Sequence, residues 1–209
     1  MAFSFLYHNF YELWELGLSN RLAWKCNTKI ILQHYLDNIS TKHIDLGVGS
    51  GYYLPFLPNN CDISILDANP KKLEIALIKM RNKRLKQIIH HDVYSHYPSE
   101  LHGKFNSASM YYLLHCLPGS MESKIVVIEN AKKLLSCRGT LFGATILGSR
   151  VTHNLAGKKL TAYYNKKGIY SNEKDSADEL YRILSTNFLK VSLNVEGSVA
   201  FFSASQKYI

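Results

Sequence analysis

Three alternating glycines follow a short apolar run in residues 42–51, which read KHIDLGVGSG. This pattern predicts a buried parallel strand that turns tightly at its carboxyl end. Because Gly47, Gly49 and Gly51 lack a Cβ, the backbone can adopt unusual dihedrals and a ligand can reach its peptide groups. An unpaired carboxylate inside an apolar run is costly, so we expect Asp45 to have a bound partner. The alternative is a glycine-rich turn without a ligand.

Two more carboxylates lie where predicted strands end. Asp67 closes the apolar run 62–67, and Asp92 stands near the end of residues 87–93. An ionised carboxylate only accepts hydrogen bonds, so Asp67 can accept from both vicinal hydroxyls of a ribose. Two alternatives stay open, an N-cap or surface acid at Asp67 and a strand-end turn at Asp92. Asn69 followed by Pro70 already has the features of the cap.

The surrounding apolar periodicity predicts helices and strands that alternate. Helical patterns occupy residues 3–18, 22–36, 70–80 and 118–139 and the region around 180–184. Strands are expected at 42–46, 62–67, 87–93, 105–110 and 140–147, followed by two strands about a turn at residues 196–198. Such alternation predicts an α/β fold, a Rossmann-like, doubly wound and mostly parallel seven-stranded sheet with a C-terminal antiparallel hairpin. Ligands of such sheets bind beyond the carboxyl ends of the strands.

Length and composition fit one globular unit. The 209 residues suit a single α/β domain over 1–209, with residues 1–40 as a helical cap and 148–172 as a lid-like segment. The four cysteines are scattered without C-x-x-C spacing, and no histidine and carboxylate set has ligand spacing, so we expect neither a metal site nor a disulfide framework. With no signal peptide and no long apolar run, the sequence predicts a cytoplasmic protein without a membrane span.

The formal net charge of +9 raises the question of nucleic acid. The densest basic patch lies in residues 79–86, at the expected end of a helix, where the helix dipole favours cations and water solvates them. A solvated face is therefore the preferred interpretation, and attraction of nucleic acid, of acidic small molecules or of acidic proteins are the alternatives.

The spacing of the glycines, an acidic residue, one residue and then G-x-G-x-G, resembles the first motif of class I S-adenosylmethionine-dependent methyltransferases. A dinucleotide-binding fingerprint would need glycine at Tyr52. Residues 110–119 (MYYLLHCLPG) and 142–148 (FGATILG) are also similar to a subgroup of small bacterial and fungal methyltransferases, many of them natural-product enzymes. The resemblance covers nearly all of the chain after residue 40. Val48 departs from the small residue or cysteine common in the family.

This resemblance implies S-adenosylmethionine as the cofactor and assigns roles to residues at the strand ends. In the family, the residue at the place of Asp67 binds the ribose, that of Asp92 accepts from the adenine amino group, and that of Val93 packs on the ring. The residues implied to bind the cofactor are Asp45, Gly47, Gly49, Gly51, Asp67, Ala68, Asp92, Val93 and Tyr111.

Tyr111, Tyr112 and His115 occupy the fourth motif, where the family places residues that face both the methionine moiety and the substrate. Methyl transfer from a sulfonium is an in-line displacement, so the protein mainly aligns the nucleophile with the methyl group. A hydroxyl or phenol acceptor benefits from a base, for which His115 is the natural candidate, and Tyr111 is the second expected catalytic residue. The alternative for His115 is a buried histidine bonded to the backbone.

Aromatic residues outside the motifs are candidates for an acceptor pocket. Tyr7 and Trp14 come from the aromatic amino-terminal helix, and Tyr163 and Tyr164 from the lid-like segment, with His115 between them. The alternatives are a helix packed on the sheet and ordinary exposed tyrosines.

The expected function is transfer of a methyl group to a small-molecule acceptor, by O- or N-methylation. One alternative is an RNA methyltransferase, although the fourth motif reads YYLL and not the N/D-P-P-Y used for exocyclic amines. The others are a non-catalytic methyltransferase-fold subunit and a NAD-dependent enzyme. The sequence leaves the acceptor, the acceptor atom and the oligomeric state open.

Overall fold

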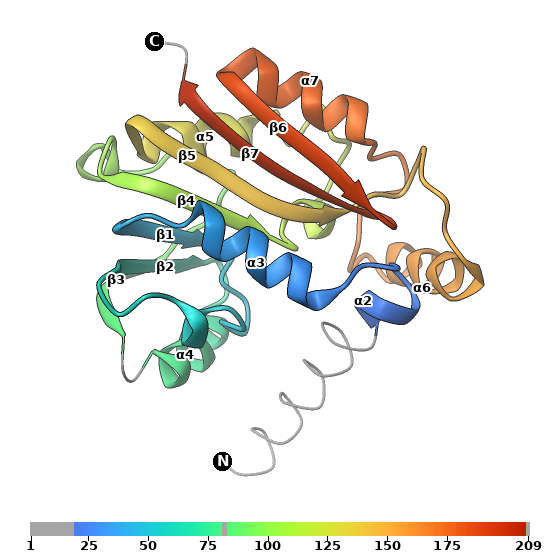
Figure 1. Ribbon diagram of the computed structural model, residues 1–209, viewed down its shortest axis with the longest axis horizontal. Coiled ribbons are helices and arrows are strands. Elements are labelled where there is room, and N and C mark those ends of the chain that lie inside the picture. The colour runs from blue at the N-terminus through green and yellow to red at the C-terminus, as the bar shows by residue number, and fades with distance from the viewer. Residues whose placement is uncertain (1–18, 81–82, 208–209) are drawn as a thin grey trace.

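A computed structural model describes residues 19–80 and 83–207, and Figure 1 shows how their elements are arranged. Within these residues one sheet of seven strands has the order β3-β2-β1-β4-β5-β7-β6. The strands are β1 (Lys42–Leu46), β2 (Asp62–Asp67), β3 (Arg84–His90), β4 (Phe105–Tyr111), β5 (Leu135–Ile146), β6 (Phe188–Glu196) and β7 (Val199–Lys207). β7 pairs antiparallel with both β5 and β6, and the other neighbours pair in parallel.

The strand order confirms the doubly wound sheet with a terminal hairpin. The chain builds β1, β2 and β3 outward in one direction and then returns to place β4 on the other side of β1. The order therefore reverses between β1 and β4, and ligands of such sheets bind at the carboxyl ends of the strands beside this point.

Helices cover both faces of the sheet. They are α2 (Ser19–Leu22), α3 (Thr28–Asn38), α4 (Pro70–Lys79), α5 (Ile125–Leu134), α6 (Leu155–Lys166) and α7 (Ala177–Asn187), with short 3-10 turns η2 (Leu54–Phe56), η3 (Ser99–Leu101) and η4 (Leu114–Cys116). α3 and α4 pack on one face, and α5 and α7 on the other (Figure 1). None of the helices in the described ranges has the length and apolar character needed to cross a membrane.

Short polar side chains start several of these helices. Asn69 accepts a hydrogen bond from the Lys71 N–H and precedes a proline at the first position of α4, as the sequence predicts. Asn27, Asn154 and Ser176 cap α3, α6 and α7 in the same way.

Several elements differ from the sequence-based expectation. β3 spans Arg84–His90 and not 87–93, and the helix expected from residue 118 begins only at Ile125. α5 ends at Leu134 and β5 begins at once, so Gly139 lies inside a strand and does not close the helix. A Cβ at Gly139 would lie 3.0 Å from the Phe105 carbonyl oxygen, so close approach of β4 explains this glycine. The lid-like segment 148–172, where the periodicity predicts no helix, contains the twelve-residue helix α6.

The loop between α2 and α3 is fastened to the far end of the chain. The Ser198 N–H donates to the Trp24 carbonyl oxygen at 2.9 Å, and Asn154 Nδ2 donates to the Leu22 carbonyl oxygen at 2.6 Å. Gly197, at the tip of the β6–β7 hairpin, has a φ of +60°, and a Cβ there would lie 2.1 Å from the same Trp24 oxygen. The hairpin tip thus fits against this loop only because residue 197 has no side chain, and the contact holds Trp24 beside the sheet.

Candidate active site

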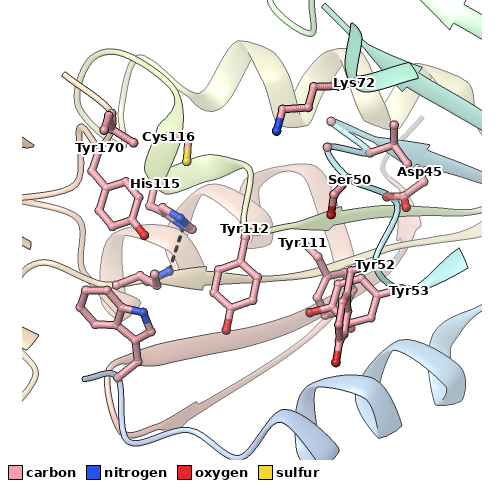
Figure 2. Close-up of a pocket in the computed structure, with 16 residues that line it drawn as sticks. Asp45, Ser50, Tyr52, Tyr53, Lys72, Tyr111, Tyr112, His115, Cys116 and Tyr170 are labelled. Carbon is pink, nitrogen blue, oxygen red and sulfur yellow. Dashed lines mark hydrogen bonds between the residues drawn. The ribbon is translucent and has the colours of Figure 1, made fainter. Parts of the chain in front are cut away.

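A cavity of about 400 Å³ lies over the carboxyl ends of β1 and β4, where the strand order reverses. Figure 2 shows that two groups of side chains face each other across it. The glycine half contains Asp45, Gly47, Gly49, Ser50 and Lys72, and the aromatic half contains Trp24, Tyr112, His115, Ile169 and Tyr170. Lys72 directs its amino group into the space between the halves (Figure 2).

The three glycines of residues 47–51 have different reasons to lack a side chain. All have a positive φ, of +67°, +56° and +68° for Gly47, Gly49 and Gly51. A Cβ at Gly47 would lie 2.6 Å from Leu113 Cδ1, and one at Gly51 would lie 2.7 Å from Leu54 Cδ1. A Cβ at Gly49 would meet no atom nearer than 3.9 Å, so its peptide borders open space. Gly47 and Gly51 serve packing, and Gly49 presents bare backbone to the cavity.

Asp45 is the buried carboxylate of the glycine half. Ser109 Oγ donates to its Oδ1 at 2.7 Å, and the Tyr35 hydroxyl donates to its Oδ2 at 3.3 Å. His43 Nε2 lies 2.9 Å from the Tyr35 hydroxyl oxygen, and His43 Nδ1 lies 2.9 Å from Ser107 Oγ. The expected partners of Asp45 are therefore neutral hydroxyls. Burial raises the pKa of Asp45 to about 7, against the lowering by the two donated hydrogen bonds.

Asp67 ends β2 beside the glycines. Its Oδ2 accepts from the Gly49 N–H at 3.0 Å and its Oδ1 from the Asn69 N–H at 2.8 Å. The N-cap alternative does not describe it, because Asn69 caps α4. Asp67 thus holds the Gly49 peptide in place, and each of its oxygens retains a further lone pair for a ligand. Ala68 follows, and its carbonyl oxygen lies 2.9 Å from His90 Nε2.

Asp92 and Val93 lie one strand further from the cavity, and neither borders it. The exposed Asp92 accepts from the Tyr94 N–H at 2.9 Å, which is the hydrogen bond of a strand-end turn. Val93 packs in the core below.

Tyr111 stands at the end of β4, where the two halves meet. Its hydroxyl lies 2.5 Å from His34 Nδ1 of α3, and its ring packs against Tyr53 and Tyr35. Burial raises the pKa of Tyr111 and lowers that of His34 to about 4, so both stay neutral at neutral pH.

His115 lies on η4 in the aromatic half and is bonded to the backbone, as its alternative interpretation predicted. The Ile146 N–H donates to Nδ1 at 3.2 Å (the dashed line of Figure 2), and Thr145 Oγ1 lies 3.3 Å from the same atom. The ring nevertheless borders the cavity. Burial, and then the nearby charge of Lys124, lower the pKa of His115 to about 3. The imidazole is neutral at physiological pH.

The lid-like segment contributes two residues that the sequence did not single out. Ile169 and Tyr170 border the cavity, whereas Tyr163 and Tyr164 of α6 do not. Tyr163 is 53% exposed, and Tyr164 supports Tyr170, with ring centroids 4.8 Å apart. Tyr7 and Trp14 lie outside the described residues.

A buried ion pair anchors the end of this segment. Lys124 Nζ donates to Asp175 Oδ2 and to the Ser171 carbonyl oxygen, each at 2.7 Å. The Ser171 N–H in turn donates to the His115 carbonyl oxygen at 2.8 Å. Tyr170 and His115 are therefore held as one assembly by bonds between segments distant in the sequence.

Sequence reasoning also missed Trp24 and Lys72, which line the cavity. Lys72 stands in the first turn of the helix that follows Asp67, and this position is a signal that could have identified it. Within the described ranges no three histidine, cysteine or acidic side chains gather as a metal site requires.

Relatives of known sequence extend along most of the chain. It is 49% identical over 193 residues to the uncharacterized protein YbcY of Escherichia coli, covering 92% of this chain and 100% of that protein. It is 36% identical over 197 residues to the physcion biosynthesis cluster O-methyltransferase of Aspergillus chevalieri, covering 93% and 88%. No protein-family model matches the chain.

Solved structures share the fold. A S-adenosylmethionine-dependent methyltransferase from Thermotoga maritima superimposes with a TM-score of 0.68 at 16% identity, covering 96% of this chain and 97% of that one. The N-methyltransferase NodS of Bradyrhizobium japonicum, in complex with S-adenosylhomocysteine, gives 0.61 at 15% identity and covers 85% and 84%.

Proposed function

The chain belongs to the class I S-adenosylmethionine-dependent methyltransferases that act on small molecules, and from this premise we propose that it methylates an oxygen of a small aromatic acceptor. The observation that carries the proposal is the cavity. One side of it has the accessible backbone of Gly49 and the buried carboxylate of Asp45, and the other side has aromatic rings around the neutral His115. Relatives named O-methyltransferases support oxygen as the receiving atom.

The residues of the glycine half fit the cofactor. The open side of Gly49 lets a ligand approach the backbone, and Asp45 offers a carboxylate to a positively charged amino group. Asp67 has lone pairs for the ribose hydroxyls. Asp92 and Val93 lie outside the cavity, so their assignment to adenine rests on the resemblance to the family alone. When bound, S-adenosylmethionine supplies a methyl group already activated by its sulfonium. The family and a solved relative with S-adenosylhomocysteine support this assignment.

The aromatic half provides the acceptor site. Trp24, Tyr112 and Tyr170 offer ring surfaces for a flat, apolar molecule, and His115 is the polar group among them. Alignment of a nucleophile with the methyl group can contribute about 7–11 kcal/mol, so a rigid pocket accounts for much of the catalysis. Tyr111, where the halves meet, completes the wall next to the reacting atoms. In this proposal residues 19–40 belong to the cap and residues 148–172 to the lid of a single domain.

Three residues of the basic patch at 79–86 are engaged within the chain. Arg84 and Lys86 both pair with Asp62, and Lys83 bonds to the Leu57 carbonyl oxygen and to Asn59. No specific observation favours RNA as the acceptor over a small molecule.

Calorimetry with S-adenosylhomocysteine tests the proposal first, followed by transfer of labelled methyl groups to a panel of hydroxylated aromatic compounds. We expect binding in the wild type and labelled methyl ethers as products. Gly49→Ala tests the glycine turn directly, because it adds a side chain at the cavity. Gly103→Ala is its matched control. Gly103 also has a positive φ, +69°, and no atom within 4 Å of its Cβ position, but lies in another loop.

Both alanine variants carry the same backbone strain, so both should lose similar stability. Only Gly49→Ala should lose the ligand. Equal binding by the two variants would remove the glycine corner from the cofactor site, and failure of the wild type to bind would overturn the proposed function.

A further inference from the structure

The two ring nitrogens of His115 face different surroundings. Nδ1 receives the Ile146 N–H at 3.2 Å, and a backbone N–H can only donate. Nδ1 must therefore hold a lone pair. A neutral imidazole has one proton, so that proton resides on Nε2.

Because Nδ1 is engaged by the backbone, Nε2 is the ring nitrogen left for a molecule in the cavity. His115 borders the cavity, and its Nε2 has no hydrogen-bond partner among the residues that the structure describes. The Tyr170 ring stands edge-on to it at 4.5 Å between centroids, with an interplanar angle of 74°, and the Tyr112 ring at 5.5 Å and 78°. These rings fix the plane of the imidazole, so its N–H bond has a defined direction.

The surroundings of His115 disfavour a second proton. Burial, and then the nearby charge of Lys124, hold the pKa of His115 at about 3. No carboxylate pairs with it in the described part of the chain. A general base would become an imidazolium with a proton on Nδ1, directed at the Ile146 N–H. A histidine base usually has a hydrogen-bond acceptor, a carboxylate or carbonyl, at Nδ1. Here Nδ1 faces a donor, the Ile146 N–H.

We propose that His115 is a hydrogen-bond donor to the acceptor oxygen in its ionised form, and not the general base. This proposal rests on the proposed function and narrows its substrate class to hydroxyls acidic enough to ionise near neutral pH, such as electron-poor phenols and enols. A donor stabilises an oxyanion, whereas it would occupy the lone pair with which an amine attacks. The donor thus favours oxygen over nitrogen as the methylated atom.

The reaction balances without a protein base. The acceptor hydroxyl loses its proton to water, and the oxyanion binds with the His115 N–H directed at it. The oxygen then forms a bond to the methyl carbon while the carbon–sulfur bond breaks and its electron pair stays on sulfur. His115 begins and ends neutral.

Two substitutions separate a donor from a base, because Asn places its amide near the Nδ1 position and Gln reaches the Nε2 position. His115→Gln keeps a donor toward the cavity, and His115→Asn keeps only the acceptor for the Ile146 N–H. For a donor, the Asn variant should lose about tenfold to hundredfold in kcat/KM while the Gln variant retains most of it. A base would be established by two results together: both variants lose all of their kcat/KM equally, and they also lose a fall in kcat/KM below about pH 6.5 that the wild type shows.

The protonation state is also measurable without turnover. In protein with ¹⁵N-labelled histidine, NMR should show His115 neutral with its proton on Nε2 from pH 5 to 8, assigned by its absence in the Gln variant. A proton on Nδ1, or titration near pH 6.5, would overturn the proposal.

A phenol whose absorbance changes when it ionises reports on the hydrogen-bond donor itself. With S-adenosylhomocysteine present, the absorbance of 4-nitrophenol should show that the bound probe ionises about one pKa unit or more below the free one, and that His115→Asn abolishes this shift. An unchanged spectrum at high probe concentration counts against the proposal. Binding of S-adenosylhomocysteine should be the same in all three proteins, so a failure of the donor and a failure of the proposed function give different results.

Discussion

The two halves of the cavity are built in opposite ways. The glycine half comes mainly from one strand and the turn after it, residues 45–50, so neighbours in the sequence are neighbours in space. The aromatic half joins Trp24, the η4 turn and Tyr170, segments brought together by bonds that cross most of the chain. The glycine half, which we propose for the cofactor, is therefore a local structure, whereas the aromatic half, which we propose for the acceptor, depends on the whole fold. Changes to distant anchors should damage the second half and spare the first.

The largest effect should follow from breaking the anchor of the aromatic half. Lys124→Met leaves Asp175 buried without its partner, which costs about 3–5 kcal/mol in the free energy of unfolding. Urea unfolding measures this loss. The exposed pair of Arg150 and Asp178 is the control, since Arg150→Met should cost no more than about 1 kcal/mol.

The Lys124→Met variant also tests whether the two halves of the cavity are independent. S-Adenosylhomocysteine affinity of the folded Lys124→Met protein should match that of the wild type. If it falls as far as acceptor affinity does, the two halves are not independent. Adding Asp175→Leu removes the unpaired charge and should recover part of the stability.

Removal of the acid beside the glycine half should act on cofactor affinity. Asp67→Ala deletes the carboxylate at the end of β2 and should weaken S-adenosylhomocysteine by about 1.5–3 kcal/mol, the range for hydrogen bonds to a charged group. Calorimetry provides the measurement. Asp62, at the opposite end of the same strand, is the matched control, and its alanine variant should bind normally. Unchanged affinity in Asp67→Ala would exclude a ribose contact.

Asp45 should give the glycine half a pH dependence that the aromatic half lacks. Burial raises the pKa of its carboxyl to about 7, so the carboxylate is present above that pH and becomes protonated below it. A protonated carboxyl attracts no ammonium group. Affinity for S-adenosylhomocysteine should therefore decline as pH falls below about 7, by up to about tenfold per unit. Titrations from pH 5 to 8 test this, and Asp45→Asn should bind weakly with little change over the range.

The smallest effects should distinguish the tyrosines of the lid-like segment. Tyr170→Ala removes a ring from the aromatic half and should weaken acceptor binding by about 0.5–1.5 kcal/mol beyond its lost area, measured as a higher KM. Tyr163→Ala, at an exposed position away from the cavity, should leave KM within error. A larger effect at Tyr163 would show that α6 takes another position when the acceptor binds.

The contrast between the local glycine half and the aromatic half, built from distant segments, also explains how much could be predicted from the sequence. The ends of β1 and β2, the cap at Asn69 and the positions of Asp45 and Asp67 follow from local patterns, and the structure shows them as expected. The bonds of Asp45 to Tyr35 and Ser109 could not be foreseen, because three elements must first come together.

Residues of the aromatic half show where prediction ends. The state of His115 depends on the Ile146 N–H, which lies 31 positions further along the chain, and no local pattern records that contact. Tyr170 borders the cavity in place of Tyr163 and Tyr164 because α6 ends and the chain turns back at Gly168, with a φ of +68°. Periodicity identifies a helix, but it does not show which neighbour that helix faces.

The contact between the hairpin tip and the α2–α3 loop has a consequence during synthesis. Ser198 reaches the Trp24 carbonyl oxygen across 174 positions of the chain. Residues 42–67, with the glycine turn and Asp67, leave the ribosome long before Gly197 and Ser198 do, and until then the Trp24 carbonyl oxygen lacks the hydrogen bond from Ser198. A nascent chain can therefore form the glycine half before the wall that carries Trp24 is fastened.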